Sequence, residues 1–174
     1  MNYFRLLVIA SILMLQYGAF VIPDDNTYLS EDLPVIEICG ERILPDSLKA
    51  DQLLLAKLIN AEAGGESLDG MRGVGDVVIY RMEHHNMSLT DVIYDAGEFD
   101  GIYSPRFKSN PSVWCMYAAK MALLRQHILP EGILFYHNPV TSTDKGWLSY
   151  IERYTYDDID NHRFCFHPNY FREI

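Results

Sequence analysis

Cysteine is scarce in this sequence, which limits how far disulfides can hold the fold. The 174 residues include three cysteines, Cys39, Cys115 and Cys165. An odd number leaves at least one thiol outside any intramolecular disulfide. Two arrangements stay open: a Cys39–Cys165 bond that ties the entry segment to the last strand, or buried thiols that act as small hydrophobic side chains.

Positive charge is also scarce. Lys and Arg number 14 against 24 Asp and Glu, so the formal net charge is −10 and the pI about 4.9. Proteins that bind nucleic acid need clustered Lys and Arg to displace counterions, so the composition argues against nucleic acid as a partner. An anionic polymer would not be attracted over a long range either. Binding of such a polymer would depend on stacking and hydrogen bonds inside a groove.

The sequence lacks the common motifs for metal, phosphate and serine-nucleophile sites. No histidine falls into a ligand spacing such as H-E-x-x-H, and Glu62 and Glu66 have no partner histidine at helical spacing. No G-x-S-x-G turn and no phosphate-binding glycine loop occurs. We therefore expect no metal and no organic cofactor.

One long apolar run is present, at the N-terminus. Arg5 precedes the run Leu6–Leu15, and the small pair Gly18–Ala19 follows. This order is typical of a signal peptide, although extension to Ile22 would just allow a tilted membrane helix, and a buried N-terminal helix is a third interpretation. We predict that residues 1–22 are a signal peptide or inner-membrane anchor, and that the protein is exported to the periplasm, the cell envelope or the medium.

The remaining length and composition suit one globular domain, with 49% hydrophobic and 22% charged residues. We predict a linker over 23–47, one domain over 48–168 and a short tail over 169–174. No repeat or low-complexity run is visible.

Periodicity predicts a mainly helical α+β domain with a small β-sheet or hairpin. The first helix begins at a cap on Asp46 or Ser47 and ends at Gly64-Gly65, where glycine suits a left-handed C′ position. The other expected elements are a second helix from Ser67–Asp69 to about Met82, a helical turn at 90–94, a long loop over 97–111, a third helix capped by Ser112, and short strands at 35–39, 133–136 and 163–166. Val113, Met116, Tyr117, Lys120, Met121 and Leu124 form the stripe expected on the third helix. Gly73 and Gly75 inside the second helix predict that another backbone packs closely there.

Glu62 is the strongest candidate for chemistry. It lies four residues after Leu58 and three after Ile59, so the apolar face of the first helix leads into a carboxylate. Partial burial and the helix C-terminus should both raise its pKa. A carboxylic acid that stays protonated can donate a proton to a glycosidic oxygen. The alternative is a structural ion pair of Glu62 with Arg72 or Arg81.

The segment around Glu62 resembles the E-A-R-G-E motif of SleB-type cell-wall hydrolases. Further matches follow in the family's order across 48–168: Leu58–Glu66, Gly70, Val77–Ile79 with Arg81, Val92–Tyr94, Gly97, Phe99, Leu134–Tyr136, Asn138–Pro139, Asn161–His162 and Phe164. The resemblance implies a single domain similar to lysozymes and lytic transglycosylases, with the first Glu of the motif, here Glu62, as the catalytic acid. Gly64 replaces the usual Arg of the motif, which puts substrate positioning in question, and Glu98 stands where Gln is common.

The resemblance favours a lytic-transglycosylase route, in which Glu62 acts first as acid and then as base. The 6-hydroxyl of the muramic acid then attacks and leaves a 1,6-anhydro end. Glu66 is the candidate second carboxylate of a competing hydrolytic route, where it would act on water.

Aromatic and polar residues in the later segments are candidates for sugar binding. Phe99, Tyr136 and Trp147 would offer ring faces, and Asn138 and Thr143 hydrogen bonds, with Tyr103 and Phe107 as further stacking candidates. Aromatic residues are more often core than cleft, so each has a structural alternative.

Together these features predict an enzyme that cleaves peptidoglycan between N-acetylmuramic acid and N-acetylglucosamine, for wall remodelling or phage-type lysis. Its partner would be the glycan strand, with membrane contact only through residues 1–22. The alternative is a catalytically silent wall-binding or structural envelope protein on the same scaffold.

Overall fold

Two long helices, α2 (Lys49–Ala63) and α3 (Leu68–His85), form the centre of the structure, a computed structural model that describes residues 36–38 and 41–171. α3 begins as predicted at Ser67, whose side-chain oxygen accepts a hydrogen bond from the Gly70 N–H. The predicted cap of α2 is wrong, because the 3-10 turn η1 (Asp46–Leu48) leads into this helix and no side chain caps it. Gly64 ends α2 in a right-handed conformation rather than the expected left-handed one.

The third helix, α6 (Val113–Leu123), packs against α2 and α3 and is capped by Ser112 as predicted. The expected stripe is confirmed only in part: Met121 and Leu124 are buried, but Val113 and Tyr117 are 74% and 44% exposed. The buried face instead consists mainly of small residues, Cys115, Ala118, Ala119, Met121, Ala122 and Leu123. Small side chains let helix axes approach closely, and a Cβ added at Gly75 of α3 would lie 3.1 Å from the Ala122 Cβ. Close packing, rather than side-chain size, decides which face is buried.

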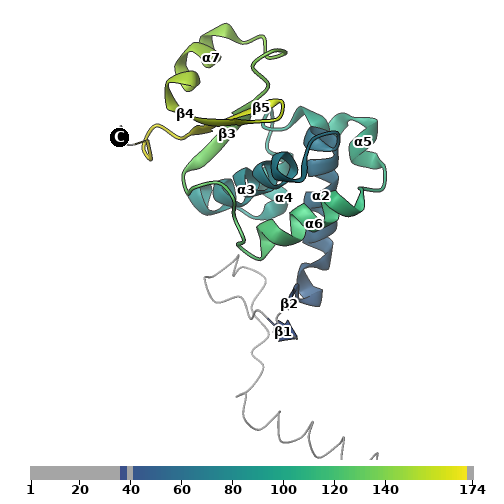
Figure 1. Cartoon of the computed structure of the whole chain (residues 1–174). Coiled ribbons are helices and arrows are strands. Elements are labelled where there is room, and N and C mark those ends of the chain that lie inside the picture. Colours follow the sequence, from purple (N-terminus) through teal and green to yellow (C-terminus); the bar gives the residue numbers. More distant parts are fainter. Residues whose placement is uncertain (1–35, 39–40, 172–174) are drawn as a thin grey trace, which may run out of the picture. The chain divides into compact units, whose positions relative to one another are not determined.

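A three-stranded antiparallel sheet packs on α3 (Figure 1). Its order is β3 (Ile133–His137), β5 (His162–Phe166), β4 (Thr155–Ile159). The structure confirms the predicted strands β3 and β5. β4 was not predicted because its sequence TYDDI is polar and its side chains are mostly exposed. The helix α7 (Lys145–Ile151), continued by η3 (Glu152–Tyr154), was not predicted either.

The predicted long loop over 97–111 contains two short helices. After α4 (Leu89–Tyr94), which confirms the expected turn, come η2 (Asp100–Tyr103) and α5 (Pro105–Lys108), both in contact with α2. Ser104 caps α5 by accepting a hydrogen bond from the Phe107 N–H. This segment therefore has a fixed position beside the end of α2.

The predicted linker range contains a short hairpin. β1 (Ile36–Ile38) falls where a strand was expected and pairs antiparallel with β2 (Glu41–Ile43), which was not expected. Residues 1–22 and Cys39 lie outside the described residues. Among the described helices, none combines the length and apolar character that crossing a bilayer requires. Cys115 and Cys165 are buried free thiols, as the second arrangement expects, whereas the Cys39–Cys165 alternative involves a residue outside the described ones.

The sheet and the helices meet where Phe164 of β5 packs on Gly73 of α3. Phe164 is fully buried, and a Cβ added at Gly73 would lie 2.6 Å from its ring. The prediction of a backbone neighbour is therefore wrong at Gly73, where the close contact is a side chain of the sheet. The mainly helical α+β class is confirmed, since the described residues form mostly helices with one small sheet besides the hairpin.

Replacing Gly73 by Ala should lower the free energy of unfolding by about 1–3 kcal/mol, because the added methyl group overpacks a rigid contact. Denaturant unfolding followed by circular dichroism measures this change. The matched control is Gly146→Ala in α7, where a Cβ meets only Asp144 Oδ1 at 3.5 Å. Equal stability of the two variants would contradict the Phe164 contact.

Candidate active site

The Glu62 carboxylate lies at the last turn of α2, half-buried and facing η2. The Gly101 N–H donates a hydrogen bond to Glu62 Oε1 at 2.8 Å. A Cβ at position 101 would collide with this oxygen, so only glycine lets the backbone approach so closely. The segment after Phe99 thus fixes the orientation of the acid.

Burial raises the pKa of Glu62 above its ordinary value, and the negative charge of Asp100 adds to this. The Gly101 hydrogen bond, the Tyr136 hydroxyl and His162 oppose the rise without cancelling it. The increase predicted from partial burial is therefore confirmed.

The alternative of a structural ion pair is wrong for Glu62. Arg81 Nη1 binds Glu98 Oε2 at 2.7 Å, and its Nε donates to the Leu134 carbonyl oxygen. Arg72 donates to the Gln126 carbonyl oxygen. Within the described part of the chain, neither arginine pairs with Glu62, so its carboxyl group remains available for chemistry.

Tyr136 of β3 lies beside Glu62. Its hydroxyl is buried and reaches hydrogen-bonding geometry with no group among residues 44–171, including Glu62. The two groups are nonetheless close enough to affect each other: burial first, and then the Glu62 charge, raise the pKa of Tyr136 well above its usual range. An unsatisfied buried hydroxyl next to an acid suits a polar group supplied by a ligand.

Glu66, the predicted second carboxylate, is held by His162. His162 Nδ1 and Glu66 Oε2 are 2.9 Å apart, and the side chains are 9% and 7% exposed. The His162 ring also packs edge-on against Tyr136, with centroids 4.8 Å apart. Gly70 makes room for this pair, because a Cβ there would lie 2.6 Å from Glu66 Oε2.

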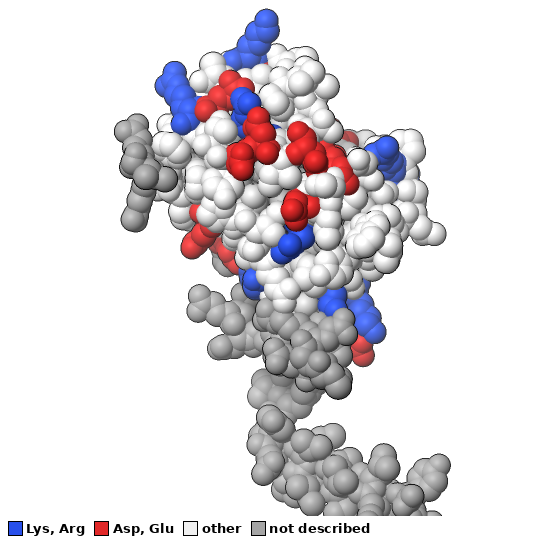
Figure 2. Space-filling model, viewed as in Figure 1, with Lys and Arg blue, Asp and Glu red and all other residues white. Residues whose placement is uncertain are grey.

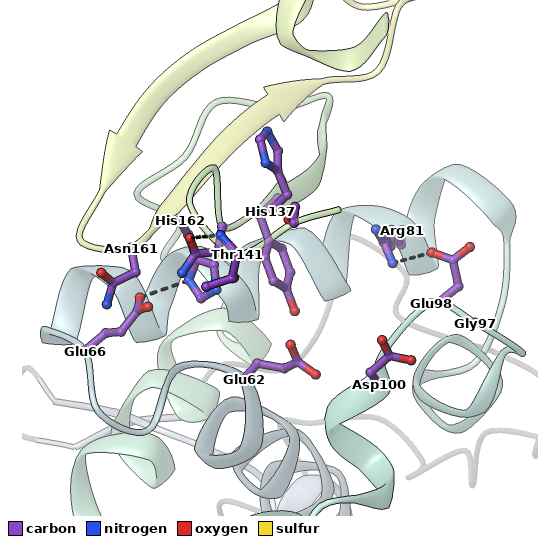
Figure 3. A pocket seen from close by; sticks show the side chains of 13 residues that line it. Glu62, Glu66, Arg81, Gly97, Glu98, Asp100, His137, Thr141, Asn161 and His162 are labelled. Atoms are coloured by element: carbon purple, nitrogen blue, oxygen red, sulfur yellow. Dashed lines mark hydrogen bonds and ion pairs between the residues drawn. The ribbon is translucent and has the colours of Figure 1, made fainter. Parts of the chain in front are cut away.

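These side chains surround a polar cavity of about 460 Å³ between α2, the 97–101 segment and the sheet (Figure 3). Its lining comprises Glu62, Glu66, Arg81, Gly97, Glu98, Asp100, Tyr136, His137, Asn138, Thr141, Ser142, Asn161 and His162. Space-filling atoms show Asp and Glu gathered over the middle of one face, with most Lys and Arg nearer its edges (Figure 2). A sugar polymer would be bound here by hydrogen bonds rather than by attraction of opposite charge.

The structure brings some of the predicted binding residues to this cavity. Tyr136 and Asn138 line it, as do Thr141 and Ser142 in place of Thr143. The Asn138 side-chain oxygen accepts hydrogen bonds from the N–H groups of Val140 and Thr141, so it shapes the turn that lines the cavity.

Four predicted aromatic residues lie away from the cavity lining. Phe99 is 3% exposed and packs under the Arg81 guanidinium, 4.9 Å from its ring centroid, so it supports the wall of the cavity. Trp147 packs against Phe135 and His137 of the sheet, with centroids 6.2 and 5.6 Å away. Of the further stacking candidates, Phe107 is buried, and Tyr103 is exposed but outside the lining.

Sequence reasoning missed Asp100 and Gly101. The signal was the length of the 97–111 segment, which favoured a functional role, but no pattern in it indicated which residues reach Glu62. The contact is between residues 39 positions apart, so only the folded chain reveals it.

The fold and the cavity together define a small α+β enzyme domain with one buried acid at the end of its central helix. Residues 65–165 match the family described as cell wall hydrolase, and the chain belongs to this family. It is therefore a cell-wall hydrolase, and peptidoglycan is its substrate class. The family match begins three residues after Glu62 and does not include it. Any role of Glu62 is therefore inferred from the geometry of the site.

Two solved structures share the fold. The catalytic domain of the Bacillus cereus SleB protein is 24% identical, with a TM-score of 0.56 over 66% of this chain and 88% of that chain. The catalytic domain of the germination-specific lytic transglycosylase SleB from Bacillus anthracis is 22% identical, with a TM-score of 0.62 over 70% and 99%. A search of curated proteins gave no match.

Replacing Gly101 by Ala should reduce the rate of peptidoglycan cleavage by about 10²-fold, because the methyl group displaces the Glu62 carboxylate and weakens its hydrogen bond. The release of soluble fragments from purified sacculi measures this rate. Gly65→Ala is the control, since a Cβ there has nothing nearer than Arg106 Nη1 at 4.0 Å. A wild-type rate for Gly101→Ala would show that the contact does not position the acid.

Proposed function

We propose that the protein cleaves the β-1,4 bond between N-acetylmuramic acid and N-acetylglucosamine, with Glu62 as the proton donor. The single observation that carries this proposal is a carboxyl group of raised pKa, free of any ion pair with Arg72 or Arg81, that faces a polar cavity. Protonation of the leaving oxygen is the step that such a group performs in glycosidic cleavage.

In the first step, Glu62 transfers its proton to the glycosidic oxygen. The bond from this oxygen to C1 of the muramic acid then breaks, and its electron pair stays on the leaving oxygen. Gly101 donates its N–H to the carboxylate that remains. Because Gly101 occupies Oε1, we assign the transferred proton to Oε2.

In the second step, the 6-hydroxyl oxygen of the muramic acid bonds to C1, and the proton of that hydroxyl passes to Glu62. The product carries a 1,6-anhydro ring, and the enzyme returns to its starting state. The engagement of Glu66 by His162 favours this route over activation of water by Glu66. The name of the Bacillus anthracis relative, a lytic transglycosylase, supports the same route.

An extracytoplasmic location follows from family membership, because peptidoglycan lies outside the cytoplasmic membrane. Export by residues 1–22, with a linker over 23–47 and a catalytic domain over 48–168, remains our proposal.

Glu62→Gln should lower the rate of sacculus digestion by about 10²–10⁴-fold, because the amide cannot donate a proton with comparable acidity. A zymogram and a rate measurement on purified peptidoglycan compare it with wild type. Glu131→Gln, the same change at an exposed site outside the cavity, is the control. Equal clearing by Glu62→Gln would remove Glu62 from its role, and no clearing by the wild type would favour a silent binding protein.

Mass analysis of the released muropeptides should show 1,6-anhydro ends, which are lighter by one water than hydrolysed ends. Reducing ends as the main product would overturn the transglycosylase route while leaving Glu62 as the acid.

The pH profile of kcat/KM should reflect the raised pKa of Glu62. The first step needs the protonated acid, so activity is kept below this pKa and lost as the pH rises through it. Since burial raises the pKa, the basic limb should lie above the ordinary glutamate value of about 4.3. A basic limb at or below that value would contradict a buried proton donor.

A further inference from the structure

Of the four carboxylates that line the cavity, two are already engaged. Glu66 binds His162, and Glu98 binds Arg81 at 2.7 Å. Each is in direct contact with a basic side chain. Neither is free to face a positive charge that forms on a substrate.

Asp100 differs from both. Its side chain is exposed to the cavity, and no group among residues 44–171 forms a hydrogen bond or ion pair with its carboxylate. Figure 3 shows Glu62 extending from α2 towards Asp100 of η2, whereas Glu66 is turned towards His162. A free carboxylate opposite the proton donor has no structural role that the fold explains.

The position of Asp100 relative to Glu62 is fixed by the backbone. The peptide bond that Asp100 shares with Gly101 supplies the N–H bonded to Glu62 Oε1 at 2.8 Å. The two acids are therefore linked by one hydrogen bond and one peptide unit. A sugar whose glycosidic oxygen reaches Glu62 would therefore lie in the cavity that Asp100 also lines.

We infer that Asp100, rather than Glu66, is the second carboxylate of the site, and that it stabilises the positive charge that develops on the sugar ring as the glycosidic bond breaks. Asp100 forms no bond and transfers no proton in this role. A negative charge a few ångströms from an oxocarbenium-like ring lowers the energy of the transition state more than that of the neutral substrate. The inference rests on the proposed function and names a further residue for it.

The same charge acts on Glu62, where it favours the protonated form. Asp100 would then favour the protonated form of Glu62 before the proton transfer. After the transfer, it would stabilise the positive charge on the sugar ring. Loss of the charge should therefore change both the rate and the pH at which activity disappears.

Asp100→Asn should cleave purified sacculi about tenfold more slowly or worse at the pH optimum, because it removes the charge and keeps the shape. Its basic limb should move to lower pH, since Glu62 then ionises more easily. Asp100→Glu should restore the charge and recover part of both properties. Asp95→Asn, an exposed aspartate outside the cavity lining, makes the same change in net charge and should alter neither.

The outcomes of these measurements separate the role of Asp100 from the proposed function, which depends on Glu62. If Glu62→Gln is inactive while Asp100→Asn keeps the wild-type rate and limb, the role of Asp100 fails and the proposed function stands. If Asp100→Asn cleaves slowly but the basic limb of its pH profile does not move, and Asp100→Glu does not recover the rate, Asp100 has only a structural role. Activity of Glu62→Gln equal to wild type would instead overturn the proposed function. Should Asp100→Asn unfold, judged by its melting curve, Asp100→Ser provides the same test.

Discussion

The hydrogen bond from the Gly101 N–H to Glu62 Oε1 is the contact on which the site depends. It joins the end of α2 to η2, two segments that the sequence separates by 39 positions. A backbone donor cannot rotate away as a side chain can, so the carboxylate keeps one orientation in both of its protonation states. The requirement for glycine at 101 is steric, because a Cβ would occupy the position of the carboxylate oxygen.

The rest of the cavity limits how strongly that carboxylate is stabilised as an anion. One N–H bond and a nearby histidine lower the pKa of Glu62, but burial and Asp100 raise it more. An ion pair with Arg81 would have kept the acid ionised and inactive as a donor. Arg81 is prevented from doing so because Glu98 binds it and Phe99 packs beneath it. The substitution of Glu for a common Gln at 98 thus gives this arginine a charged partner.

Features that depend on neighbouring residues could be predicted from the sequence. Features that depend on packing between distant segments could not. Ser112 was identifiable as a helix cap, and Glu62 as a carboxylate on an apolar face, because each depends on neighbours within one helical turn. The buried face of α6 was misjudged because close approach to Gly75 selects alanines over larger residues. Asp100 was missed because it reaches the site through a turn of η2 that has no periodic signal.

The loss of the motif arginine at position 64 acquires a physical meaning in this structure. A Cβ at Gly64 would collide with the Asn60 carbonyl oxygen, so this chain ends α2 in a way that admits no side chain there. The Asn60 side-chain amide donates instead to the Arg106 carbonyl oxygen, and Arg106 Nη1 lies 4.0 Å from the place of a Cβ at Gly65. α5 therefore brings a guanidinium group next to the glycine pair. The Arg106 guanidinium group lies beside this segment, and the Glu62 carboxylate keeps its contact with Gly101.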